Sequence, residues 1–486
     1  MVLGIEERRA QIDSLRARIS ALGGLGAPRS PNSDGQAWPR PSPTRRPPAS
    51  ELQLDSAERA AALGFAAERA AGGTAFVRRV SVGLRPLLNG AGLEAAPGPE
   101  GLLGLGCRLP PEGRVTTPAE EEVVVLDIET LGLRGSGVLA FLVGLGTPAG
   151  DRLEVEQLLL ADPEGETALL SALISRLRRR RLIVTYNGRC FDVPALVARC
   201  VVNRLPPAGL EDPLHADLLG PVRRLFRDRL GVCTLRQAEG GLLGYEREGD
   251  VPGCEAPARY RTWLRSGCAA LLRGVVVHNE LDLCTTMVLG SRLAAHVGGH
   301  LVKPIHPADR YNLGRFLDAE HHLREALEAG EEPWSRRAGH HLARRLARRS
   351  PSERMEAVEI WQGLWNTRAT DLRAARAVAV GRERAGDLNA ALAVCRRVQR
   401  LCSPDSPVAG VQRRHPASLW TGEWQRRCAR LERRVESRRV RHPGTTPESP
   451  PGGQQSGHLE TRRRRVDGGR FPHSVTLSGG QRSVHL

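Results

Sequence analysis

"VVVLDIET" occupies residues 123–130 and places two carboxylates, Asp127 and Glu129, at the end of an apolar, β-branched run. Side chains alternate along a strand, so both acids point to one face while Ile128 points to the core. Two neighbouring like charges repel each other, whereas a divalent cation turns the repulsion into ligation by hard oxygen donors. A solvent-facing strand edge is the more common explanation of a lone D-x-E pattern, so these residues alone do not establish a cation site.

The sequence around this stretch predicts an α/β layer structure. Three β-branched or apolar runs of strand length predict an antiparallel meander: residues 121–130, 137–148 and 152–161. A helix follows from Pro163 to about Arg180, because acids open it and the basic run "RLRRRR" closes it. A short strand at 182–186 and a helix that begins near Asp192 complete the pattern.

Two further segments carry acids at positions suited to chemistry. In "VTYNGRCFDVPAL" (184–196) a strand and an Asn-Gly turn precede Asp192, where the helix dipole favours an anion and where an ordinary N-cap is also expected. In "VVVHNELDLCTTMVL" (275–289) His278 and Asp282 are four residues apart and share one helix face. A histidine beside a metal-ligating acid can accept a proton from water. A surface ion pair is the alternative, but the apolar surroundings favour a buried face.

The order D-x-E, D, H-x-x-x-D is much more specific than any one of its parts. Four carboxylates that meet in a cleft could hold two Mg²⁺ or Mn²⁺ ions about 4 Å apart, an arrangement that hydrolyses phosphodiesters. The combined motifs therefore predict metal-dependent hydrolysis of a nucleic acid.

Four stretches, "LDIETLGL", "TYNGRCFDVPAL", "HADLLGPVRRLF" and "VVVHNELDL", resemble the DEDD 3′-to-5′ exonuclease superfamily of the ribonuclease H-like fold. The sequence is most similar to the YprB-type bacterial proteins, which carry a tetratricopeptide-like helical segment behind the nuclease domain. The resemblance implies an α/β ribonuclease H-like fold, a mixed sheet with flanking helices, followed by an all-α domain. It also implies four metal ligands and a general base, namely Asp127, Glu129, Asp192, Asp282 and His278, of which Asp127, Glu129 and His278 are catalytic.

The resemblance extends to the substrate, and one feature departs from it. Residues expected at the terminal nucleotide or beside Asp192 are Thr130, Leu131, Asn187 and Phe191. The histidine branch of the superfamily usually places its base five residues before the last aspartate, whereas His278 stands four before it, in the register of the tyrosine branch. Asp217 is a second candidate acid, more plausible as a support for the ligands or as a helix cap. Arg223 and Arg224 could follow a phosphate backbone or form a solvated helix face.

The chain divides into five expected parts: a short helix and Pro/Arg-rich linker (1–50), an accessory, weakly helical segment (51–120), the exonuclease domain (121–300), a helical repeat domain (305–402) and a basic disordered tail (403–486). Within the fourth part "MEAVEIWQGL" (355–364) aligns with "NAALAVCRRV" (389–398) at a shift of 34 residues. This is the period of tetratricopeptide repeats. With two copies visible, a plain helical bundle is the alternative.

Composition limits the partners. The chain has 486 residues and a formal charge of +17, and residues 403–486 supply 16 basic against 7 acidic side chains. Polyanion binding is expected, although Lys303 is the single lysine, so arginine-rich codon usage explains part of the excess. The ten cysteines form no C-x-x-C pair, and no apolar run is long enough for a membrane span, so a cytoplasmic protein is expected. Single-stranded DNA or RNA is the expected substrate; the alternative is a catalytically silent scaffold whose repeats bind nucleic acid or a protein partner.

Overall fold

The computed structural model describes most of the chain beyond the N-terminal segment, in eight stretches: residues 55–91, 93, 98–105, 116–132, 138–211, 213–299, 306–402 and 417–441. The helix and linker expected at 1–50 lie outside these residues. Helices in the described part lack the combination of length and apolar character needed to cross a bilayer.

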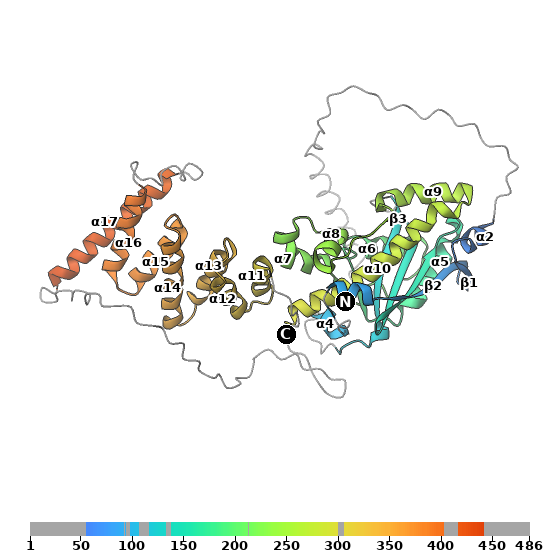
Figure 1. Ribbon diagram of the computed structural model, residues 1–486, viewed down its shortest axis with the longest axis horizontal. Coiled ribbons are helices and arrows are strands. Elements are labelled where there is room, and N and C mark those ends of the chain that lie inside the picture. The colour runs from blue at the N-terminus through green and yellow to red at the C-terminus, as the bar shows by residue number, and fades with distance from the viewer. Residues whose placement is uncertain are drawn as a thin grey trace, which may run out of the picture. The chain divides into compact units, whose positions relative to one another are not determined.

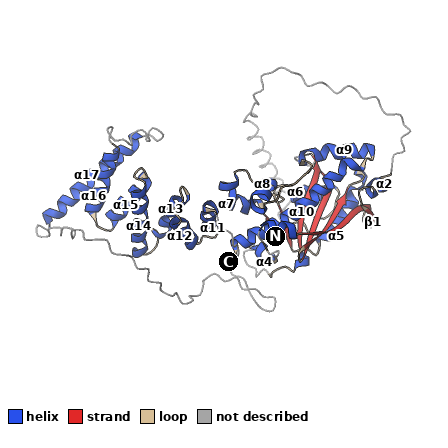
Figure 2. Ribbon diagram, in the orientation of Figure 1, coloured by secondary structure: helices blue, strands red, loops and turns tan. Residues whose placement is uncertain are grey.

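A seven-stranded mixed sheet forms the centre of the first part (Figure 2), in the order β1-β2-β5-β4-β3-β6-β7. Its strands are β1 (Ala66–Ala70), β2 (Gly73–Gly83), β3 (Val123–Leu131), β4 (Leu139–Ala149), β5 (Arg152–Leu159), β6 (Leu182–Thr185) and β7 (Leu214–Asp217). Strands β3, β4 and β5 are antiparallel neighbours, so the predicted meander is confirmed. Strand β6 joins β3 in parallel, and β7 joins β6 in parallel.

The weakly helical pattern expected over residues 51–115 is wrong for residues 66–83, which form two strands of the sheet. Strand β2 pairs with β5 from Phe76 to Gly83. Its outer half alternates, since Val80 and Val82 are half-buried while Ser81 is exposed. This period of two is the signal of a strand with one covered face, and it competes with the alanine-rich composition that suggests a helix. The sheet therefore begins well before residue 121.

Helices cover both faces of the sheet. They are α2 (Ser56–Ala61), α3 (Arg85–Ala91), α4 (Pro99–Leu103), α5 (Glu166–Leu177), α6 (Asp192–Val202), α7 (Leu219–Leu230), α8 (Leu235–Ala238), α9 (Ala256–Ser266) and α10 (Ala269–Val297). The helices predicted from Pro163 and from Asp192 are confirmed as α5 and α6. Helix α10 crosses the sheet and contacts β3, β4, β5 and β6 (Figure 1).

The alternation of β3 divides the core between the two faces. Val124, Leu126 and Ile128 pack with α5, α6 and α9, while Val123 and Val125 pack with α7 and the second half of α10. Positions 127 and 129 continue the face of Val123 and Val125, because side chains two apart share a face. Strand β3 therefore aims both of its acids at the side on which α10 lies.

The rest of the chain is helical: α11 (Pro307–Phe316), α12 (Glu320–Glu328), α13 (Trp334–Leu346), α14 (Pro351–Thr367), α15 (Leu372–Arg384), α16 (Leu388–Leu401) and α17 (Ala417–Arg441). Each helix packs against the next. Ala357 on α14 and Ala391 on α16, which align at the 34-residue shift, are both completely buried. Hydrogen bonds and ion pairs join this helical region to α7: Arg229 pairs with Asp309 at 2.9 Å, and Asn312 donates to the carbonyl of Leu225 at 3.1 Å.

The disorder expected throughout residues 403–486 is wrong for residues 417–441, which form α17. Trp424, Cys428 and Leu431 are buried and join the core of α15 and α16. Their spacing of four and three residues makes one apolar stripe on a helix. The many arginines of this segment obscure that stripe, because the average composition is strongly basic. The remainder of the expected tail lies outside the described residues.

Candidate active site

Three elements carry the predicted acids to one place. Strand β3 carries Asp127 and Glu129, α6 begins at Asp192, and α10 carries Asp282. Asp192 does not cap its own helix; instead its Oδ1 accepts a hydrogen bond from the backbone N–H of Ile128 on β3 at 3.1 Å. The start of α6 is thereby fixed against the strand between its two acids.

An amide relay holds α10 against the sheet beside Asp127. Asn279 Nδ2 donates to Asp127 Oδ2 at 2.8 Å, and Asn279 Oδ1 accepts from Gln157 Nε2 on β5 at 2.9 Å. Gln157 Oε1 in turn accepts from Arg78 at 2.7 Å. The approach requires glycine at position 144, because a Cβ there would lie 2.3 Å from Asn279 Oδ1. Sequence reasoning missed Asn279 and Gln157; the signal available was an Asn between His278 and Asp282 in an otherwise apolar helix.

His278 is oriented by an aspartate that the sequence did not reveal. Its Nδ1 lies 2.8 Å from Asp250 Oδ1, in the loop before α9. Its Nε2 lies 3.9 Å from Glu129 Oε1 and 3.6 Å from Asp282 Oδ2. One ring nitrogen is thus anchored while the other faces two of the predicted ligands.

Arg247 is a buried cation that pairs with three acids, among them Asp282. Its Nη2 pairs with Asp282 Oδ1 at 2.5 Å, its Nη1 with Asp250 Oδ2 at 3.2 Å, and its Nε with Glu239 Oε2 at 3.0 Å. Glu239, in a π-helical turn over Glu239–Leu243, is completely buried. Burial acts to lower the pKa of Arg247, but Asp282 and Glu239 raise it above its usual value, so the guanidinium stays charged. No sequence motif pointed to Arg247, because Glu239 and Asp282 lie 8 and 35 positions away from it.

The site carries more negative charge than its cations neutralise. Burial, followed by repulsion from Asp282 and Asp192, raises the pKa of Glu129 to about 8. Burial and the nearby Asp217 and Asp282 raise the pKa of Asp192 to about 7, although backbone hydrogen bonds act in the opposite direction. Burial, followed by repulsion from Asp282, Asp192 and Glu129, raises the pKa of Asp127 well above its usual range. The predicted ligands are therefore close enough to repel one another.

A divalent cation fits the chemistry of this donor set. Within the described stretches, no three or more His, Cys, Asp or Glu side chains stand close enough to hold an ion in their present arrangement. The carboxylates instead use partners that an ion would replace or share: Asn279 for Asp127, Arg247 for Asp282 and the Ile128 N–H for Asp192. Crowded carboxylates with raised pKa values are what hard cations such as Mg²⁺ and Mn²⁺ stabilise.

The residues expected beside the acids occupy varied positions. Thr130 is buried and its hydroxyl donates to the Gly132 carbonyl at 3.1 Å, Leu131 is half-buried at the end of β3, and Phe191 is half-buried just before α6. Asn187 is exposed, with a positive φ of 72°, and its backbone N–H donates to Asp217 Oδ1 at 2.8 Å.

Asp217 holds the backbone of this turn. Its carboxylate also accepts from the N–H groups of Arg189 at 3.1 Å and Leu219 at 3.1 Å. These contacts agree with its expected supporting role.

Arg223 and Arg224 lie on the exposed side of α7. The guanidinium of Arg224 stacks on the ring of Phe316, 4.5 Å from its centre. Both arginines line a cavity of about 260 Å³ between α7 and α11. Among the described residues no hydrogen bond or ion pair joins them to the acids on β3, α6 or α10, so the structure does not bring them into that cluster.

Comparison with known proteins agrees with this fold. Residues 124–294 match the RNase_H superfamily. The chain is 30% identical over 245 residues to the uncharacterized protein YprB of Bacillus subtilis (strain 168), covering 49% of this chain and 59% of that protein. The chain thus spans less than two thirds of the length of this relative. A family B DNA polymerase from the hyperthermophilic archaeon Pyrobaculum calidifontis is similar with a TM-score of 0.31 and 15% identity, over 42% of this chain and 28% of the polymerase.

The described residues therefore form a ribonuclease H-like domain followed by a helical region.

Proposed function

We propose that this ribonuclease H-like chain is a DEDD-type exonuclease that shortens single-stranded DNA or RNA from the 3′ end with two Mg²⁺ or Mn²⁺ ions. The observation that carries the proposal is the meeting of β3, α6 and α10 at one cluster of carboxylates, in which burial and mutual repulsion raise the pKa values of Asp127, Glu129 and Asp192. A protein gains nothing in stability by burying such a cluster, because like charges and desolvation both oppose folding. The match of residues 124–294 to the RNase_H superfamily supports the same function.

Four carboxylates are the proposed ligands: Asp127, Glu129, Asp192 and Asp282. When bound, the ions supply the positive charge that activates water and stabilises the leaving oxygen of a phosphodiester. The protein contributes the rigid placement of the oxygens. Asn279 and the Ile128 N–H each fix one carboxylate by a single hydrogen bond, which orients the group without neutralising it.

His278 is the proposed general base. If Nδ1–H donates to Asp250, Nε2 carries the free lone pair of the ring. Nε2 can then accept a proton on the side of Glu129 and Asp282. Asp250 is in this proposal a positioning residue, since it fixes the tautomer and the plane of the imidazole. A histidine four residues before the last aspartate can serve, because positions four apart share a helix face.

The helical region is proposed to be tetratricopeptide-like. The packing of each helix against the next one in the chain and the equivalent burial of Ala357 and Ala391 support a repeated helix pair. A catalytically silent scaffold is the second candidate. The ion pair between Asp282 and Arg247 favours it, because a guanidinium already neutralises one proposed ligand.

The test is degradation of 5′-labelled single-stranded DNA and RNA by the full chain, with Mn²⁺, Mg²⁺ or EDTA. We expect a metal-dependent ladder that shortens from the 3′ end, no cleavage of a circular strand, and a loss of rate of about 100-fold or more in Asp127→Asn and Asp192→Asn. Asp151→Asn is the matched control, because Asp151 is an exposed carboxylate on the turn after β4 that pairs with Arg85. Absence of shortening with every metal and strand would establish the scaffold instead, and cleavage of the circle would establish an endonuclease.

A further inference from the structure

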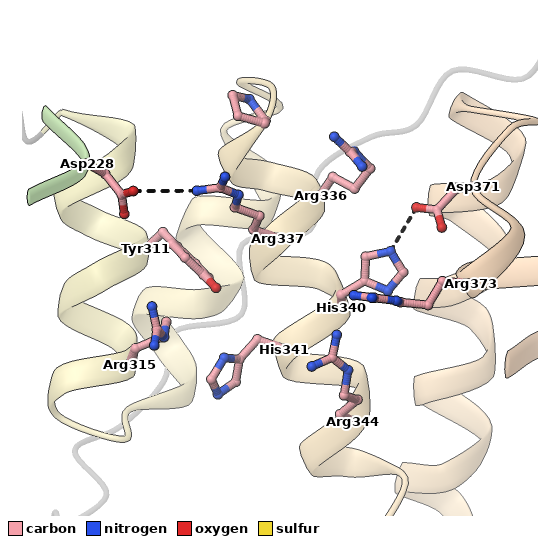
Figure 3. Close-up of a pocket in the computed structure, with 11 residues that line it drawn as sticks. Asp228, Tyr311, Arg315, Arg336, Arg337, His340, His341, Arg344, Asp371 and Arg373 are labelled. Carbon is pink, nitrogen blue, oxygen red and sulfur yellow. Dashed lines mark hydrogen bonds and ion pairs between the residues drawn. The ribbon is translucent and has the colours of Figure 1, made fainter. Parts of the chain in front are cut away.

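A basic groove lies on the helical region, away from the carboxylate cluster. Its central part is a cavity of about 610 Å³ between α11, α13 and α15 (Figure 3). Five arginines line it: Arg315, Arg336, Arg337, Arg344 and Arg373. His340 and His341 lie among them, and in Figure 3 the side chains of Arg344 and Arg373 lie around His340. We call this cavity and its two neighbours the arginine groove.

The groove continues in both directions. A cavity of about 790 Å³ shares His340, Arg344 and Arg373 with the central part and extends along α14 and α15 to α17. In the other direction the cavity between α7 and α11 shares Arg315 and Asp228 with it. That cavity adds the arginines of α7, which is a helix of the ribonuclease H-like domain. The three cavities therefore form one basic path from α7 along the helical region.

The positive charge of the central part is largely uncompensated. Its two acids are already engaged: Asp371 accepts from His340 at 2.8 Å and from the Ala374 N–H at 3.0 Å, and Asp228 accepts from Asn312 at 3.0 Å. Asp228 also lies 3.7 Å from Arg337.

Three arginines of the groove are available to a ligand. Arg315, Arg344 and Arg373 are exposed, and within the described part of the chain they have no carboxylate partner. Exposed like charges that the fold brings together without partners cost stability, so their arrangement is better explained by binding than by structure.

We infer that the arginine groove binds the phosphate backbone of single-stranded nucleic acid and holds the strand behind the 3′ end that enters the ribonuclease H-like domain. The inference rests on the proposed exonuclease function for its direction. Planar guanidinium groups bind phosphate oxygens in pairs, and all cations but the histidines here are arginine. Along the path Arg315 stacks on Tyr311 and Arg224 stacks on Phe316, which holds both guanidinium groups in place.

Continuity with the nuclease domain favours a nucleic acid over an acidic peptide. Helix α7 begins two residues after Asp217, which accepts from the backbone N–H groups of Asn187 and Arg189 in the turn that leads into α6 and its first residue, Asp192. The end of the groove on α7 is therefore connected to the carboxylate cluster by a few residues of chain. A strand bound in the groove has a short route to that cluster, whereas a protein partner needs no such route.

The test is binding of a labelled single-stranded oligonucleotide to the full chain in EDTA, where turnover is not needed. The groove variant is Arg315→Ala, Arg344→Ala and Arg373→Ala combined. The matched control removes three exposed arginines of the same region that line none of the three cavities: Arg348→Ala, Arg433→Ala and Arg439→Ala. On a single strand each neutralised phosphate contributes about 0.7 to the salt slope, so three lost contacts should weaken binding about 100-fold at about 0.1 M salt and lower the slope by about 2.

The control should bind as the wild type does, and all proteins should show the same thermal unfolding. Equal affinity of groove variant and control overturns the inference, whether or not the wild type cleaves anything. A poly-glutamate peptide of matched charge that competes as well as the oligonucleotide also overturns it, in favour of an acidic protein partner. Failure of the proposed nuclease function has a different readout: no metal-dependent shortening by the wild type while the groove still binds the strand.

Discussion

The free energy of unfolding of the metal-free protein should increase as the pH falls from about 9 to about 6. The site carboxylates take up protons over this range and then no longer repel one another in the folded state. Glu129 has a raised pKa of about 8 in the folded state against 4.5 as its ordinary value, and Asp192 about 7 against 3.8. At a pH between the ordinary and the raised pKa of each group, the folded chain binds a proton that the unfolded chain has released. Stability therefore decreases as the pH rises from the ordinary pKa values of 3.8 and 4.5 to about 8, and the destabilisation is absent below those ordinary values.

The size of the effect follows from the pKa values. One pKa unit corresponds to about 1.36 kcal/mol. The raised pKa of Glu129 lies about two pH units above pH 6, and that of Asp192 about one. Raising the pH from about 6 to about 9 therefore lowers the free energy of unfolding by about 4 kcal/mol. Asp127 shifts in the same direction and adds to this cost. Since domains are stable by about 5–15 kcal/mol, the midpoint of thermal unfolding should fall by about 10 °C.

The assay is thermal unfolding followed by circular dichroism across this pH range, with EDTA or with Mn²⁺. A bound cation favours the ionised carboxylates, so Mn²⁺ should raise the midpoint most at high pH and flatten the dependence. Glu129→Gln should flatten it in EDTA, whereas the control Asp151→Asn should leave it unchanged. Stability in EDTA that stays constant or increases up to about pH 9 would refute the reasoning, because the acids would then not be crowded in the folded state.

Three further substitutions test individual contacts. Asp250→Ala frees His278 and should lower kcat about 10- to 100-fold with little change in KM, measured on labelled oligonucleotides; an unchanged kcat excludes the positioning role. Gly144→Ala should cost about 1–3 kcal/mol in urea unfolding and reduce activity, because its Cβ collides with the amide relay. Its control, Gly363→Ala, has open space on α14 and should be neutral or stabilising. Arg247→Met leaves buried carboxylates unpaired and should cost about 3–5 kcal/mol in EDTA, part of which Mn²⁺ restores; equal losses with and without metal argue against a shared site.

Local patterns predicted the part of the fold that local forces determine. The meander of β3, β4 and β5 and the start of α6 follow from residue alternation, strand length and charge at the helix ends. The face shared by Asp127 and Glu129 followed from the same period of two. That these acids meet Asp192 and Asp282 was implied only by the family resemblance, because no spacing within one sequence specifies how a sheet and two helices approach each other.

The missed residues are those whose function depends on tertiary contacts. Arg247 and Asp250 lie in an irregular segment, and their partners are on α10 and in a π-helical turn. No period relates such positions in sequence. Strand β2 and helix α17 were missed for a different reason: both contain an apolar period, but an alanine-rich stretch precedes β2 and arginine dominates the composition of α17. Composition averages over a segment, whereas burial depends on which face each residue occupies.

Arg247 supplies part of the positive charge that so acidic a cluster requires in the metal-free protein. It neutralises Asp282, the one proposed ligand on α10, and at the same time contacts Asp250, which orients His278. The three remaining ligands retain protons instead, as their raised pKa values require. Protons and a guanidinium thus neutralise the carboxylates that two divalent ions would otherwise neutralise. A bound divalent cation would have to replace the protons and the guanidinium. Carboxyl groups lose their protons more easily at high pH. The carboxylates that destabilise the metal-free fold under alkaline conditions should therefore give the largest gain in stability when a metal binds under those conditions.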